Sequence, residues 1–158
     1  MAENIVRTTE RPARWAAERG SISAMVIVLI VMLFAVAGLI YDGGRAINAR
    51  QQTFDDVEQA ARAGANQIDM DLFRSSGIVR IDEAAAIERA RAYLTDLNQT
   101  RSWSYDPARI SVVASETEVQ VTAERTVPTG MLQLVFVNSF DVSGQASSQP
   151  EIGIGGGP

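Results

Sequence analysis

The feature that most constrains this chain is an unbroken run of uncharged, mostly apolar residues, Ser21–Tyr41. A helix rises about 1.5 Å per residue, so a run of this length spans roughly the 30 Å of bilayer hydrocarbon. Backbone groups in lipid must bond to one another, which favours a helix despite the β-branched residues. Trp15 and Tyr41 flank the run and suit the two membrane interfaces. The sequence therefore predicts a transmembrane helix over residues 21–41, with the lipid bilayer as its surroundings.

Basic residues near the run predict its orientation. Four precede it and only two follow it closely, and those two are mixed with acidic residues: Arg7, Arg11, Arg14 and Arg19, against Arg45 and Arg50. Membrane proteins keep the more basic flank in the cytoplasm. We therefore expect residues 1–20 to form a flexible cytoplasmic leader, and the remainder of the single-pass chain to lie outside the cell membrane.

A secretory signal peptide is the main alternative for this run. Ala35-Val36-Ala37 resembles a signal-peptidase site, and the stretch before it has about the length of a signal-peptide core. The apolar run nevertheless continues to Tyr41 and leads directly into a helical pattern. Gly38, together with the two alanines, also forms a small-residue patch that could receive another helix.

Composition excludes several functions. The chain has no His and no Cys, and its 14 basic residues are all arginine, so it lacks the residues of Ser-His, Cys-His, Schiff-base and usual zinc chemistry. Its net charge of −5 argues against a nucleic-acid surface. Asp69 and Asp71 are interpreted as solvated carboxylates, since calcium loops need more oxygen ligands. We predict no catalytic, cofactor or metal site, no small-molecule substrate, and a protein that is not an enzyme.

Residues 42–68 are predicted to extend the membrane helix outside the bilayer. Gly43-Gly44 could kink it. Apolar and small residues then recur at heptad spacing and predict a seam that packs against another helix or a sheet: Ile47, Phe54, Val57, Ala61, Gly64 and Ile68. The opposite face is expected to carry the polar residues Gln51, Gln52, Asp56, Gln59 and Arg62.

Residues 69–148 are predicted to form a small α+β domain. Residues 70–77 are interpreted as a loop, and Asp82 as the N-cap of a second helix, with a stripe of Ile87, Ala90, Leu94 and Leu97. Alternating residues then predict a hairpin whose inward positions are Ile110, Val112 and Ala114 on one strand and Val119, Val121, Ala123 and Val127 on the next. Pro128 ends the second strand.

After the hairpin, residues 131–137 are expected to form a short helix or a buried segment. Phe140, Val142 and Ala146 suggest a third strand, and residues 149–158 a flexible Gly-rich tail. Trp103 and Tyr105 are expected to pack over the sheet edge rather than to touch a partner. The fold class is therefore α+β: a long N-terminal transmembrane helix extends into a small head with a three-stranded antiparallel sheet. A core this small is marginal alone, so the helix extension is expected to complete it.

Three segments together resemble a known family: Glu18-Arg19-Gly20-Ser21, the stretch Tyr41–Arg50 after the apolar run, and the Ala-rich stretch Gln59–Ala65. In this order they are similar to the N-terminal region of TadE/TadG-like proteins of the tight-adherence (Flp) pilus. The resemblance covers roughly residues 18–68. Its motif positions are Asp42, Gly44, Arg45, Ala60, Ala61 and Gly64.

The resemblance implies a minor pilin or pseudopilin-like structural component of Flp pilus assembly. Other pilin-like subunits or Tad assembly-platform proteins would be its partners, and prepilin-type cleavage would fall between Gly20 and Ser21. One departure concerns Met25, which stands where type IV-like prepilins typically carry Glu as the fifth mature residue. The alternative is a membrane-anchored cell-envelope binding module with no filament role.

Overall fold

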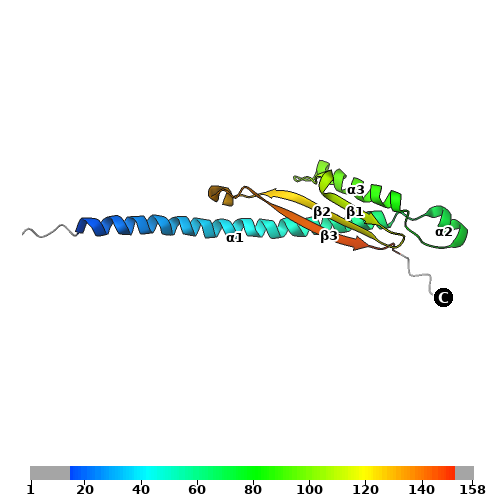
Figure 1. The fold of residues 1–158 in the computed structure, drawn as a ribbon, viewed down its shortest axis with the longest axis horizontal. Helices are drawn as coiled ribbons and strands as arrows, with labels where there is room; N and C mark the ends of the chain where they lie inside the picture. The colour runs from blue at the N-terminus through cyan, green and yellow to red at the C-terminus, as the bar shows by residue number, and fades with distance from the viewer. Residues whose placement is uncertain (1–14, 152–158) are drawn as a thin grey trace, which may run out of the picture.

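A single long helix organises the molecule (Figure 1). The computed structural model describes residues 15–151, with side chains from residue 22 onward. Helix α1 runs from Trp15 to Ala65 without interruption, a length of about 75 Å for its 51 residues. Gly43-Gly44 lie inside the helix and do not break it. Residues 15–20 of the expected flexible leader are helical, which corrects that part of the prediction, and residues 1–14 lie outside the described residues.

The N-terminal part of α1, before Val31, projects away from the rest of the molecule. The large apolar side chains of α1 are exposed from Ile22 to Tyr41, as in Met25, Leu29 and Phe34. By length and composition this is a helix that can cross a membrane, and it lies near the N-terminus, where a signal sequence would satisfy the same criterion.

The C-terminal half of α1 carries a small head. A three-stranded antiparallel sheet, in the order β1-β2-β3, is formed by β1 (Ile110–Ala114), β2 (Val119–Pro128) and β3 (Ser139–Ser148). Helices α1 and α3 (Glu83–Thr100) pack on the sheet. Three short helical segments complete the described head: α2 (Met70–Ser76), η1 (Pro107–Arg109) and η2 (Leu132–Val135). The α+β fold class is confirmed.

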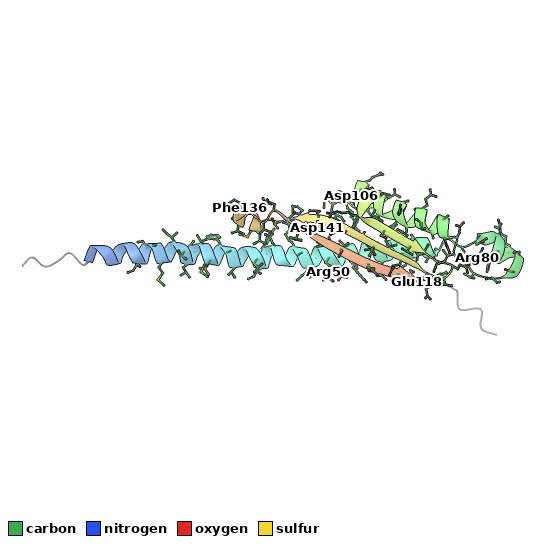
Figure 2. All side chains as sticks on the ribbon, in the orientation of Figure 1. Arg50, Arg80, Asp106, Glu118, Phe136 and Asp141 are labelled. Atoms are coloured by element: carbon green, nitrogen blue, oxygen red, sulfur yellow. The ribbon has the colours of Figure 1, made fainter. Side chains whose placement is uncertain are left out.

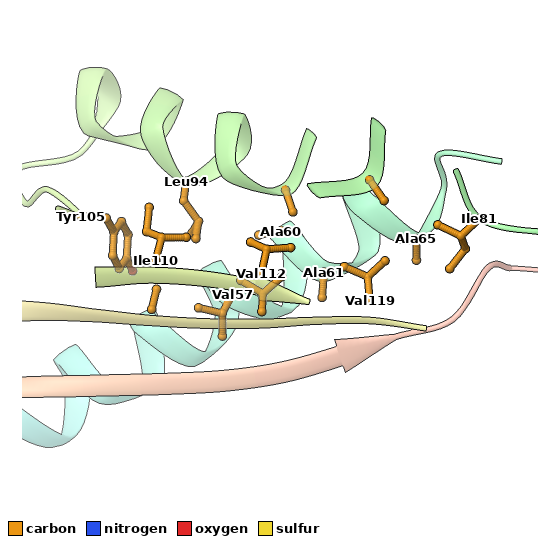
Figure 3. Close-up of a cluster of buried hydrophobic side chains, with 14 residues drawn as sticks. Val57, Ala60, Ala61, Ala65, Ile81, Leu94, Tyr105, Ile110, Val112 and Val119 are labelled. Atoms are coloured by element: carbon orange, nitrogen blue, oxygen red, sulfur yellow. The ribbon is translucent and has the colours of Figure 1, made fainter. Parts of the chain in front are cut away.

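The core lies between the two helices and one face of the sheet (Figure 3). Helix α1 contributes mostly small residues and α3 contributes Leu94, while inward residues of β1 and β2 fill the other side: Val57, Ala60, Ala61, Ala65, Ala86, Ala90, Ile110, Val112, Val119, Val121 and Ala123. The C-terminal half of α1 is therefore part of the head's core, as expected for a head too small to be stable alone.

Two glycines let backbones approach α1 closely. A Cβ placed on Gly144 of β3 would lie 3.1 Å from backbone atoms of Thr53 and Phe54. A Cβ placed on Gly64 would lie 3.0 Å from the Ala86 carbonyl oxygen of α3 and 3.1 Å from Val119. These two residues mark where α1 crosses the sheet and where it crosses α3.

The hairpin, the third strand and the second helix match their predictions. Residues Ile110, Val112 and Ala114, predicted to face inward, pair with Ala123, Val121 and Val119 of the predicted second strand. Strand β2 ends at Pro128, and the Asp82 carboxylate accepts a hydrogen bond from the Ala85 amide, as an N-cap does. In β3, Val142 is buried and Phe140 packs against it.

The segment after α1 differs from the prediction in two ways. The helix ends at Ala65 rather than at residue 68, because Ile68 leaves it to form a β-bridge with Ile81. The predicted loop 70–77 is helix α2 instead, with Asp69 capping its N-terminus and Gly77 ending it at φ 73°. Helix α2 has seven residues and buries none of them, so it lacks the apolar periodicity that reveals longer helices.

The buried face of α1 is also rotated from the predicted seam. Val57, Ala61 and Gly64 are buried, whereas Ile47 and Phe54 are exposed within this chain. Asp56, expected on the polar face, is buried. A strict seven-residue repeat drifts around a straight helix, and the buried positions instead follow the helical period of 3.6: Ala49, Thr53, Asp56, Val57, Ala60, Ala61, Gly64 and Ala65.

Candidate functional site at the junction of helix and loop

The loop between β2 and β3 is held against α1 by one carboxylate, just beyond the apolar run. Asp42 is 1% exposed and accepts three backbone hydrogen bonds from the loop that joins β2 to β3, residues 129–138. Gly130 donates to its Oδ1 at 2.7 Å, while Met131 and Leu132 donate to its Oδ2 at 2.9 and 2.7 Å. A carboxylate suits this role because it is acceptor-only and can take several donors.

Close packing surrounds this contact. A Cβ on Gly130 would lie 2.9 Å from the Tyr41 ring and 3.1 Å from Asp42, and a Cβ on Gly38 would lie 3.2 Å from Met131. The Arg45 guanidinium lies 3.9 Å from the Asp42 carboxylate. The small-residue patch around Gly38 thus contacts this chain's own loop.

The β2–β3 loop satisfies much of its own backbone. Thr129 donates through its amide to Asn138 and through its hydroxyl to the Val137 carbonyl. The amides of Leu134, Phe136 and Val137 donate back to Met131, Gln133 and Leu132. The Gln133 side chain donates to the Thr129 carbonyl. Residues 131–137 were expected to be a short helix or a buried segment: they contain the short helix η2, but most of their side chains are exposed (Figure 2).

A second polar cluster is buried between α1 and β2. The Arg125 Nε donates to the Thr53 hydroxyl at 2.9 Å, and its Nη2 donates to the Ala49 carbonyl at 2.9 Å and to Gln52 at 3.1 Å. The centre of the Trp103 ring lies 4.2 Å from the guanidinium carbon of Arg125. Burial lowers the pKa of Arg125. Sequence reasoning missed this residue, although the alternation of β2 places position 125 on the inward face between Ala123 and Val127.

Tyr105 anchors the other end of this cluster. It is 1% exposed, and its hydroxyl donates to the Asp56 carboxylate at 2.8 Å. Burial, followed by this hydrogen bond, raises the pKa of the Tyr105 hydroxyl above its ordinary value. The side-chain nitrogen of Asn98 in α3 donates to the Tyr105 carbonyl, and its side-chain oxygen accepts from the Tyr105 amide. These contacts make Tyr105 a buried structural residue of the head's core.

The predicted site residues fall into separate groups. Asp42 and Arg45 lie at the loop junction, whereas Ala60, Ala61 and Gly64 lie in the head's core. A Cβ on Gly44 would meet nothing within 4 Å. Gly20 and Ser21 lie in α1, but their side chains are outside the described residues.

Asp69, interpreted from the sequence as a solvated carboxylate, caps α2 and pairs with Arg80 at 3.1 Å. Within residues 15–151 no group of three or more His, Cys, Asp or Glu side chains could hold a metal ion.

These features define a class of protein with one long helix. The N-terminal, apolar half of the helix can cross a membrane by its length and composition, and the other half is built into a small α+β head. Residues 20–67, which include all of α1 beyond the leader and the two residues after it, match the family model described as putative Flp pilus-assembly TadE/G-like. The suspected TadE/TadG-like resemblance is confirmed over that segment. No curated protein and no solved structure gives a significant match to the chain.

Proposed function

We propose that this protein is a minor pilin or pseudopilin-like structural component of Flp pilus assembly, held in the cell membrane by one helix. The observation that carries the proposal is the family match over residues 20–67, which covers both the apolar half of α1 and the part built into the head. A helix with one half free and apolar and the other half bearing a head is the shape that a subunit needs to pack into a filament.

In the proposed topology residues 1–20 are a cytoplasmic leader, residues 21–41 cross the bilayer, and the head, residues 42–148, lies outside. The surplus of arginine before the apolar run supports this orientation. The chemistry is that of assembly rather than catalysis. Its partners are the bilayer, other pilin-like subunits and the assembly platform.

The two residues of the predicted seam that remain exposed supply a surface for such partners. Ile47 is 72% exposed and Phe54 is 43% exposed, and both lie on α1 beyond the apolar run. Gly44, a motif residue of the resemblance, has an open surface around it. The small and apolar character of this strip suits close approach by another helix. We propose that it contacts a neighbouring pilin-like subunit.

The proposal is tested by the intact mass of the protein in membranes from cells that carry the assembly system. We expect loss of residues 1–20 and a new N-terminus at Ser21. A Gly20→Leu variant should retain the leader, and a Gly43→Leu variant, changed at another glycine of the same helix, should be cut normally. The same membranes, cross-linked from a photoreactive residue at Ile47, should give adducts with pilin-like subunits.

Other results would count against the proposal in distinct ways. A chain that begins at Gly38 would be a secreted protein released by signal peptidase, without a membrane helix. A full-length chain with no adduct at Ile47 would favour a membrane-anchored envelope binding module. A full-length chain that does cross-link to pilin-like subunits would retain the assembly role but remove the prepilin processing.

A further inference from the structure

The β2–β3 loop presents apolar side chains to its surroundings at the level of the membrane helix. Phe136 is 93% exposed and Leu134 is 76% exposed, and Val135 and Val137 are exposed beside them. No charged residue occurs from Thr126 to Phe140. An exposed, contiguous apolar surface of this kind marks an interaction site in a soluble domain, or a surface that is not in water.

The loop lies alongside the part of α1 that is proposed to be in lipid. Its residues Met131, Leu132, Leu134 and Val135 border a shared apolar groove with α1 residues Val31, Phe34, Ala35 and Gly38. Figure 1 shows η2 turned back along α1 toward the N-terminus. From Asp42 to Val31 the helix rises about 16 Å, which is roughly half of the 30 Å hydrocarbon thickness.

Most backbone amides of the loop are also hydrogen-bonded within the chain, as a non-aqueous environment requires. An unpaired backbone N–H in lipid costs several kcal/mol. Asp42 accepts the amides of Gly130, Met131 and Leu132, and the next turns of the loop bond internally. The Arg45 guanidinium lies next to this carboxylate, so the pair carries no net charge.

Phe136 itself points to the same conclusion. It is the one non-glycine residue with positive φ within the described chain, at 65°. This conformation is unfavourable for a bulky side chain and is tolerated better by Asn or Gly. Strain of this kind is a reason to look for function. Here it holds an aromatic side chain outward at the loop's tip.

We infer that the β2–β3 loop, residues 129–138, is a second membrane element, which inserts Leu134, Phe136 and their neighbours among the lipid acyl chains of the leaflet on the head's side. The occupant of the apolar groove is then lipid, because the groove is continuous with the exposed surface of the membrane helix. Together, α1 and the loop fix the head's height and rotation on the bilayer. The inference rests on the proposed placement of residues 21–41 in the bilayer.

Spin labels on single cysteines test this depth, since the chain has no cysteine of its own. The full-length protein is reconstituted in phosphatidylcholine–phosphatidylglycerol vesicles with a label at Leu134→Cys, Phe136→Cys, Leu29→Cys or Asp71→Cys. Leu29 lies in the membrane helix, and the Asp71 side chain is fully exposed on α2. Collisions with oxygen report lipid, whereas collisions with a water-soluble nickel chelate report solvent.

We expect the labels at Leu134 and Phe136 to collide with oxygen as the Leu29 label does, and to be protected from nickel, unlike the Asp71 label. Ready access of nickel to Leu134 and Phe136, with Leu29 protected, would overturn the inference while leaving the membrane helix in place. Access at Leu29 as well would overturn the anchoring itself. Protection from both reagents that disappears when the protein is diluted in lipid would assign the loop to a second copy of the chain and also overturn the inference.

Discussion

At the residue scale, Asp42 has the most specific role. Its carboxylate accepts three successive backbone amides, which an asparagine side chain cannot do because its NH₂ group is a donor. We expect Asp42→Asn to release the β2–β3 loop from α1 while the head remains folded. Hydrogen exchange in detergent micelles should become faster at Gly130, Met131 and Leu132. Asp55→Asn, at an exposed position of the same helix, should leave that exchange unchanged, and equal protection in both variants would refute the role of Asp42.

Tyr105 gives a second prediction at this scale. Tyr105→Phe removes the hydroxyl that donates to the buried Asp56 carboxylate and leaves that oxygen without this donor. Loss of one partner of a buried hydrogen bond costs about 1–3 kcal/mol. The free energy of unfolding, measured with urea, should fall by about that amount. Tyr93→Phe is the matched control, since its ring is partly buried beside the same core and its hydroxyl makes no hydrogen bond within residues 15–151. Equal small losses in both variants would contradict the prediction.

At the scale of elements, the position of α1 depends on backbone contacts at glycine. Gly144→Ala would place a Cβ 3.1 Å from the backbone of Thr53 and Phe54, where no flexible side chain can move aside. Overpacking of this kind costs about 1–3 kcal/mol, and the urea midpoint should fall. Gly43→Ala should do the opposite, because it lies in open space within the helix, where alanine is favoured by about 1 kcal/mol. A stable Gly144→Ala variant would mean that β3 and α1 separate more readily than their contact suggests.

The elements differ in how well the sequence predicts them, and the reason is local. The hairpin and α3 carry their own signals, in the alternation around Val121 and in the Asp82 cap, so they were predicted. Helix α2 buries nothing and therefore has no apolar period, although Asp69 and Gly77 could have indicated its ends.

Long-range contacts between elements were not predictable in this way. Asp42 and Gly130 are 88 residues apart, and Arg125 and Thr53 are 72 apart. The sequence pattern around Asp42 or Arg125 does not indicate which residue each one contacts. The family resemblance marked Asp42 as a motif position but gave it no partner. The rotation of the α1 seam likewise depends on where the sheet lies, which the heptad pattern of the helix does not encode.

At the scale of the whole molecule, surface carboxylates should make the head sensitive to acid. Hydrogen bonds from the Leu72 amide and then Arg80 lower the pKa of Asp69, and those from Thr126 and then Arg109 lower the pKa of Asp141. Both groups bind protons less readily when folded. Their contribution is therefore present above their ordinary pKa of 3.8 and is lost as the pH falls through the lower folded values.

The urea midpoint should thus fall between pH 6 and pH 2.5. The fall should be smaller in a variant with both Asp69→Asn and Asp141→Asn than in an Asp71→Asn control, whose side chain is fully exposed. An identical fall in the two variants would show that other groups determine the acid response.

The C-terminal part of α1 and the head form one folding unit rather than two, because the core takes Val57, Ala60, Ala61 and Ala65 from α1. A fragment of residues 42–151 keeps these residues and should unfold cooperatively in a thermal melt followed by circular dichroism. A fragment of residues 67–151 lacks them, and at this size a core without its central helix is too small to be stable. We expect it to show no cooperative transition, and a sharp melt would refute the shared core.

The longer fragment also exposes the β2–β3 loop to water, so it should self-associate at high concentration, and Phe136→Asn should reduce that association without lowering its melting temperature.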